Sequence, residues 1–122
     1  MVLVDTSVWV EHLQRVSREL AGLLQRAQVL SHPFVLGELA LVRLQQRATI
    51  FDAFQNLPQA CVARTEEVFG LIGIHGLHGL GIGYMDACLL ARVRLTPGGV
   101  LWTPDKLLAA GGWLAALKGT FF

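Results

Sequence analysis

Cysteine is scarce in this sequence, and no two cysteines stand close together. Cys61 and Cys88 each lie in an apolar stretch, without a CxxC motif and without a neighbouring histidine of the metal-binding kind. This pattern excludes a disulfide framework and gives no sign of a zinc site. We expect both thiols to be small buried side chains of a protein in the reducing cytoplasm.

The sequence also lacks a large net charge and any targeting signal. The chain carries ten Lys and Arg residues and nine Asp and Glu residues, a formal charge of +1, so any contact with nucleic acid must come from local clusters. No basic segment precedes the first apolar run, which Asp5 and Glu11 interrupt, so no signal peptide is expected. The longest uncharged stretch, residues 68–85, contains six glycines and two histidines, and we expect no membrane span there.

What the chain has in excess is apolar residues, in short runs that alternate with helical patterns. They make up 53% of the sequence and the mean hydropathy is +0.51, a surplus that should form an interface. We expect strands at 2–4, 29–31, 60–63 and 100–103, with an edge strand in the tail. We expect helices at 6–16, 18–26, 33–44, 48–56 and 85–95, one that starts at residue 65, and a short one at 104–110. The alternation predicts one α/β domain over residues 1–122, with a parallel sheet of four to five strands and a site beyond the carboxyl ends of the strands.

Four of the nine acidic residues occupy unusual places. Asp5 ends the first expected strand and Asp105 follows the fourth, both at the sheet edge where sites of α/β proteins form. Glu38 lies within an apolar helix, in FVLGELALV, and Asp86 begins a helix amid apolar neighbours, in GYMDACLLA. The other five acids lie in more polar surroundings and should be solvated.

These acids also have a simpler interpretation. Asp5 and Asp105 could cap helices, and Asp86 could favour a helix dipole. A cap does not explain Glu38 in mid-helix, and a buried carboxylate has to lose its charge or find a cation. If all four converged, like charges about 5 Å apart would repel by roughly 3 kcal/mol per pair at an effective dielectric of about 20. Such a cluster needs a divalent ion, and oxygen ligands favour Mg²⁺ or Mn²⁺, whose natural chemistry is phosphodiester hydrolysis.

The order of the motifs resembles that of PIN-domain nucleases, most of all the VapC-type toxins of toxin–antitoxin pairs. The motifs are DTSVW at the amino end, a glutamate in an apolar helix, DACLLA, and LWTPDKLL, and the similarity spans the whole chain. The resemblance implies a three-layer α/β/α PIN-like fold and an acidic Mg²⁺ or Mn²⁺ site that cuts RNA. Carried over to this sequence, the family's acids fall on Asp5, Glu38, Asp86 and Asp105, with Thr6 and Thr103 as supporting hydroxyls.

The chain departs from the family pattern at one position. Many relatives place another acid two residues after the last aspartate, where this chain has Leu107. A second metal ion would therefore be held loosely or arrive with the RNA. The resemblance further implies a VapB-type antitoxin over the active-site groove, and a homodimer, or a heterotetramer or larger assembly with the antitoxin.

The main prediction is a metal-dependent endoribonuclease, the toxin of a type II toxin–antitoxin system. The four acids would hold one or two Mg²⁺ ions, and a bound water would attack phosphorus to leave 5′-phosphate and 3′-hydroxyl ends. Arginines could grip structured or single-stranded RNA, although a solvated surface role is the simpler interpretation for each. The candidates are Arg43, Arg47, Arg92 and Arg94.

Three other interpretations stay open. A metal-free ribonuclease would use two histidines as acid and base, but the sequence places no acid to orient the rings of the HGLH pair. Its candidates are His12, His32, His75 and His78. A receiver-like phosphoacceptor module would need paired acids after the first strand, where Asp5 stands alone. An inert PIN-like scaffold that only binds a partner is the third, and Leu107 keeps it open.

Overall fold

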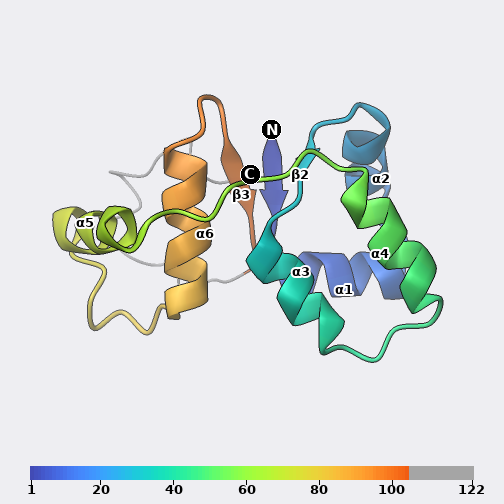
Figure 1. The fold of residues 1–122 in the computed structure, drawn as a ribbon, viewed down its shortest axis with the longest axis horizontal. Helices are drawn as coiled ribbons and strands as arrows, with labels where there is room; N and C mark the ends of the chain where they lie inside the picture. The colour runs from blue at the N-terminus through green and yellow to red at the C-terminus, as the bar shows by residue number, and fades with distance from the viewer. Residues whose placement is uncertain (105–122) are drawn as a thin grey trace.

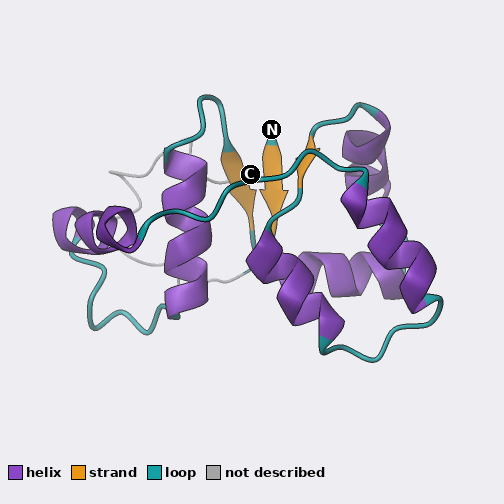
Figure 2. Ribbon diagram, viewed as in Figure 1, coloured by secondary structure: helices purple, strands orange, loops and turns teal. Residues whose placement is uncertain are grey.

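The computed structural model describes residues 1–104, and the elements below belong to that part of the chain. The strands β1 (Val2–Val4), β2 (Val29–Leu30) and β3 (Val100–Trp102) form a parallel sheet in the order β2-β1-β3. β1 lies in the middle, with Val2 opposite both Val29 and Val100 (Figure 2). Because the strands are parallel, the residues that follow them lie along one edge of the sheet, the carboxyl edge.

Six helices accompany the sheet within residues 1–104. They are α1 (Thr6–Gln14), α2 (Arg18–Gln25), α3 (Pro33–Ala40), α4 (Arg47–Gln55), α5 (Thr65–His75) and α6 (Tyr84–Arg94). Figure 1 shows α6 beside β3 with α5 beyond it, and α1 to α4 on the other side of β1. The predicted α/β alternation around a parallel sheet is confirmed. None of these helices combines the length and the apolar character that a bilayer crossing requires.

Local chemistry sets several helix ends. Ser17 Oγ accepts the N–H of Leu20 at 3.3 Å and so caps α2. Pro33 begins α3, in the first turn, where its missing N–H costs nothing. Gly76 ends α5 with φ of 60°, a left-handed conformation that glycine adopts without strain. The glycine-rich segment that follows, residues 77–83, is a loop.

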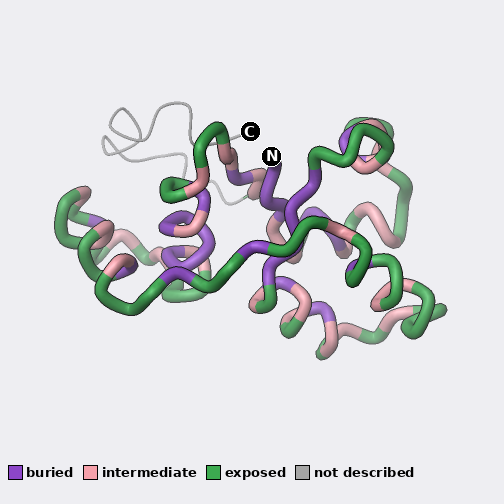
Figure 3. The backbone as a smooth tube through the Cα atoms, turned by 45° about the horizontal axis from the view of Figure 1, so that its top comes forward, coloured by how far each residue is buried: buried purple, intermediate pink, exposed green. Residues whose placement is uncertain are grey.

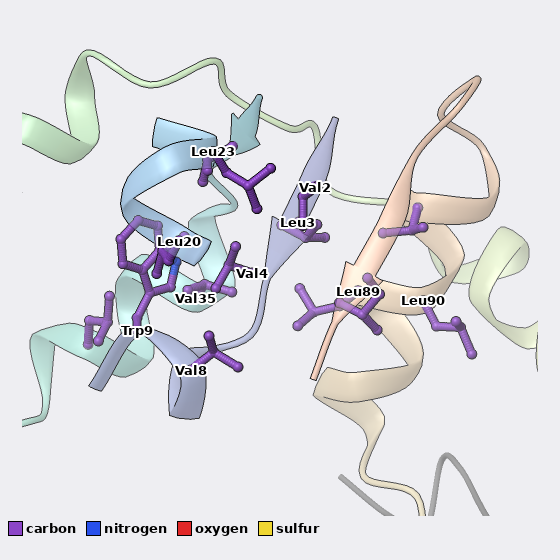
Figure 4. Packing of buried hydrophobic residues seen from close by; sticks show 14 of the residues in the cluster. Val2, Leu3, Val4, Val8, Trp9, Leu20, Leu23, Val35, Leu89 and Leu90 are labelled. Carbon is purple, nitrogen blue, oxygen red and sulfur yellow. The ribbon is translucent and has the colours of Figure 1, made fainter. Parts of the chain in front are cut away.

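The core lies where the central strand meets the apolar faces of the helices. Leu3 and Val4 of β1 are almost completely buried. Figure 4 shows Leu89 and Leu90 of α6 on one side of β1, and Val35 and Trp9 with α1 and α3 on the other. In Figure 3 the strands β1 and β2 are buried while the outward turns of the helices are exposed. This packing fixes the carboxyl edge of the sheet against the first turn of α1.

The prediction of a strand at residues 60–63 is wrong. A single parallel bridge, between Ser31 and Gln59, comes just before this segment, and residues 60–63 pair with no strand of residues 1–104. The physical reason is that β2 cannot continue, because α3 begins at Pro33 directly after the bridge. The sheet of the described residues therefore has three strands instead of four to five. The edge strand predicted in the tail lies outside the described residues.

Two smaller predictions also fail. The helix at Pro33 ends at Ala40, well before residue 44, and Leu41 beyond it is 90% exposed. Cys88 is buried as expected, but Cys61 is exposed, on the segment that leaves the sheet after the bridge. Both thiols are free.

Candidate active site

Asp5 joins β1 to α1 and lies at the carboxyl edge. Its backbone N–H donates to the carbonyl oxygen of Trp102 at 2.9 Å, which fixes it against the end of β3. Its Oδ1 accepts the N–H of Thr6 at 2.7 Å, so Asp5 is the N-cap of α1. Its Oδ2 accepts the Oγ1–H of Thr103 at 2.9 Å, from a residue 98 positions away. Asp5 is therefore a cap and a site residue at once, and neither interpretation excludes the other.

Glu38 projects from α3 toward the start of α1. Thr6 Oγ1 donates to Glu38 Oε1 at 2.9 Å, across 32 positions of sequence. Glu38 is half-buried, because α3 has one buried side, with Val35 and Leu39, and not a fully buried surface. Hydrogen bonds thus connect Thr103 to Asp5, Asp5 to Thr6, and Thr6 to Glu38. We call these four residues the Asp5–Glu38 cluster.

The cluster is rich in negative charge. None of the arginines of residues 1–104 forms a salt bridge with Asp5 or Glu38. Each hydroxyl donates its hydrogen to a carboxylate, so both carboxylates keep lone pairs for a further ligand. Half-buried carboxylates held in this way suit a hard cation.

The donor chemistry of the cluster fits Mg²⁺ or Mn²⁺. The ligands are oxygen atoms alone, and Mg²⁺ is commonly held by one or two carboxylates while it keeps waters for a substrate phosphate. Among residues 1–104, no set of three or more Asp, Glu, His or Cys residues is placed to hold a metal ion. Within residues 1–104, the Asp5–Glu38 cluster supplies two carboxylates.

The other two acids stand differently. Asp86 lies half-buried in the first turn of α6. Since α6 leads through a short turn into the amino end of β3, its first turn lies toward the carboxyl edge. Asp105 lies outside the described residues. The convergence of all four acids stays a prediction.

The candidate arginines lie apart from one another. Arg43 lies in the connection between α3 and α4, and Arg47 is the first residue of α4. The Arg47 guanidinium lies 4.7 Å from the centre of the Phe51 ring. Arg92 and Arg94 lie in the last turn of α6, at the opposite end of that helix from Asp86. Their contact with RNA stays a prediction.

The structure gives His32 a clear local role. It is completely buried at the start of α3, and its Nδ1 accepts the N–H of Phe34 at 3.0 Å, which caps the helix that carries Glu38. Burial, and then the charge of Arg92, lower the pKa of His32. The sequence suggests only an acid or base role for His32. The signal that could have found its cap role is its place directly before Pro33 at a helix start.

The other histidines form no recognisable acid–base pair within residues 1–104. His75 ends α5 and His78 is exposed in the following loop. No carboxylate in that part of the chain accepts a hydrogen bond from any of the four imidazoles. Among the aromatic residues, Trp9 and Phe54 belong to the core, while Phe34 and Phe51 are half-buried.

Similarity to individual proteins shows the family to which the chain belongs. No model of a known protein family matches the chain. It is similar to Ribonuclease VapC32 of Mycobacterium tuberculosis, from strain CDC 1551 / Oshkosh and from strain ATCC 25618 / H37Rv. Each is 46% identical to this chain over 110 residues, which cover 90% of this chain and 89% of the relative. With this identity over nearly the full length of both proteins, the chain belongs to the VapC family of PIN-domain toxins.

Proposed function

We propose that this protein is a Mg²⁺- or Mn²⁺-dependent endoribonuclease and the toxin of a type II toxin–antitoxin system. The name of its relatives, Ribonuclease VapC32, supports the activity. The observation that carries the chemistry is the Asp5–Glu38 cluster, where Thr6 joins two carboxylates: its backbone N–H donates to Asp5, and its hydroxyl donates to Glu38 of α3. The structure thus supports an acidic site at the carboxyl edge of the sheet.

Asp5 and Glu38 would hold the ion, and Asp86 and Asp105 would complete its ligands. When bound, the divalent ion would lower the pKa of a water for attack on phosphorus and stabilise the leaving oxygen. The chain itself supplies orientation. Thr103 and the N–H of Thr6 hold the two oxygens of Asp5, and the Thr6 hydroxyl holds one oxygen of Glu38. Both carboxylates are therefore preorganised before RNA or metal arrives.

We also propose the partners that the family membership suggests. A VapB-type antitoxin would cover the site, and the toxin would form a homodimer, or a heterotetramer or larger assembly with the antitoxin, in the cytoplasm. Exposed apolar side chains support a protein contact, since Leu41 is 90% exposed, Ile74 81% and Phe69 60%.

The test of the catalytic proposal is Asp5→Asn. Asparagine caps helices about as well as aspartate, so the variant should keep its fold while it loses the negative charge. We expect cleavage of RNA with Mg²⁺ or Mn²⁺ to fall at least about 100-fold, and Glu38→Gln to behave alike. Asp52→Asn, on the exposed side of α4, is the matched control and should cleave at the wild-type rate.

Two results would overturn this function. One is cleavage by Asp5→Asn at the wild-type rate. The other is cleavage by the wild-type protein in excess EDTA, which would instead favour a histidine-based mechanism.

A further inference from the structure

A groove of ≈ 300 Å³ runs between α1 and the end of β3. Val8, Glu11 and His12 line it from α1, Arg15 lines it from the end cap of that helix, and Trp102 lines it from β3. Glu11 and His12 follow Val8 by three and four residues, so these three lie on one side of the helix, and Arg15 comes directly after its last residue, Gln14. We call this surface the α1–β3 groove.

The α1–β3 groove adjoins the Asp5–Glu38 cluster along the chain. The carbonyl oxygen of Trp102 accepts the backbone N–H of Asp5. The next residue, Thr103, donates its hydroxyl hydrogen to the Asp5 carboxylate. Val8 lies in the first turn of α1, which Asp5 caps. A strand of nucleic acid bound in the groove would therefore pass beside the proposed catalytic carboxylates.

Arg15 gives the groove an available positive charge. Its side chain is exposed and forms no hydrogen bond or salt bridge with another described residue. Glu11 lies four residues earlier in the chain, yet the two side chains form no salt bridge. By contrast, Arg47 lies over the Phe51 ring and Arg64 pairs with Glu67. A guanidinium with free donors is the side chain best suited to a phosphate.

His12 adds a neutral donor next to this charge. Its Nδ1 accepts the backbone N–H of Ser17 at 3.0 Å, so in the neutral ring the hydrogen is on Nε2. Burial lowers the pKa of His12, which keeps the ring neutral near pH 7. Trp102 is half-buried, packs against the core and lines the groove, and an aromatic ring is the kind of side chain on which bases stack.

We propose that the α1–β3 groove binds the RNA strand next to the phosphate that is cut, with Arg15 and His12 at a backbone phosphate and Trp102 against a base. This inference rests on the proposed function, since it takes the Asp5–Glu38 cluster as the place of cleavage. The groove would contact the RNA backbone through charge and a base by stacking against its flat face. It should therefore favour single-stranded RNA without a strict sequence. Arg15 is a binding residue that the sequence analysis did not single out.

The test measures binding apart from cleavage. Fluorescence anisotropy of a labelled single-stranded RNA is followed in excess EDTA over a series of salt concentrations, and a gel confirms that the RNA stays intact. Arg15→Gln should bind roughly 3- to 10-fold more weakly, with a slope of log affinity against log salt that is smaller by about 0.7. Arg15→Lys keeps the positive charge but loses the planar guanidinium, and should keep most of the slope of log affinity against log salt. Glu11→Gln should bind more tightly, because it removes a negative charge from the groove.

Arg18→Gln is the matched control. Arg18 is an exposed arginine at the first residue of α2, outside the groove, and its loss changes the net charge by the same amount. The proposal predicts less than about a twofold effect there. Equal weakening in Arg15→Gln and Arg18→Gln would overturn it, because general charge would then explain both.

Other outcomes would also overturn the groove proposal. These are an unchanged affinity and salt slope in Arg15→Gln, or an effect of Arg15→Gln on self-association or antitoxin binding alone. Metal-dependent cleavage by the wild-type protein and its loss in Asp5→Asn test the proposed function separately. The two proposals can therefore fail independently.

Discussion

Thr6→Val removes the hydroxyl that links the two halves of the Asp5–Glu38 cluster and keeps the shape of the side chain. The backbone N–H of Thr6 still donates to Asp5 Oδ1, so the cap of α1 is retained. What is lost is the hydrogen bond of 2.9 Å from Thr6 Oγ1 to Glu38 Oε1. Glu38 then has to be held by α3 alone.

The magnitude follows from this single hydrogen bond. A hydrogen bond to a charged group contributes about 1.5–3 kcal/mol, but water can replace part of it because Glu38 is only half-buried. We therefore expect the free energy of unfolding to fall by about 1 kcal/mol. Groups that orient metal ligands typically contribute 10- to 100-fold to metal affinity or activity, which corresponds to about 1.4–2.8 kcal/mol. The functional loss should exceed the loss of stability.

The assay combines urea unfolding with RNA cleavage over a range of Mg²⁺ concentrations. Thr6→Val should need roughly 10- to 100-fold more Mg²⁺ or cleave that much more slowly. Thr6→Ser keeps the hydroxyl and should stay within about threefold of the wild-type protein. If Thr6→Val loses stability but cleaves RNA with the wild-type Mg²⁺ dependence, the hydrogen bond is structural and the cluster does not position metal ligands.

Urea unfolding checks three further predictions. The pKa of His32 is lowered in the folded protein, so as the pH falls below about 6.5 the unfolded chain binds a proton before the folded protein does. The free energy of unfolding should therefore fall from about pH 7 to 5. His32→Asn should make this dependence flatter than in the wild-type protein. Leu39→Ala should lose about 2–5 kcal/mol because Leu39 is fully buried, and a change near zero would contradict the described core. Gly99→Ala should lose about 1–3 kcal/mol because its Cβ would lie 3.0 Å from the carbonyl oxygen of Val93, whereas Gly70→Ala, which meets open space in α5, should gain up to about 1 kcal/mol. Equal signs for the two glycine variants would contradict the packing around the α6–β3 turn.

Most of the order of elements could be predicted from local chemistry. Ser17, Pro33 and Gly76 mark helix ends through interactions within a few residues, and short sequence windows contain that information. The strand expected at 60–63 failed because strand formation depends on a neighbour. The neighbour that it meets within residues 1–104, β2, gives way to α3 at Pro33.

The candidate site was partly predictable for the same reason. Asp5 and Glu38 stood out because carboxylates are costly in apolar surroundings, a property of their immediate neighbours. The link through Thr6 spans 32 positions and that through Thr103 spans 98, so only the fold could show which hydroxyl holds which acid. Arg15 was missed because an arginine four residues after Glu11 looks like half of an ordinary surface pair.

Titration calorimetry with Mn²⁺ tests the central claim most directly, because it measures the ion at the Asp5–Glu38 cluster without RNA or partner. The wild-type protein and Asp52→Asn should bind Mn²⁺ with the same affinity, while Asp5→Asn and Glu38→Gln should each bind at least about tenfold more weakly. Equal heats of Mn²⁺ binding in all four proteins, or none in the wild-type protein, would contradict a metal site built on these two carboxylates.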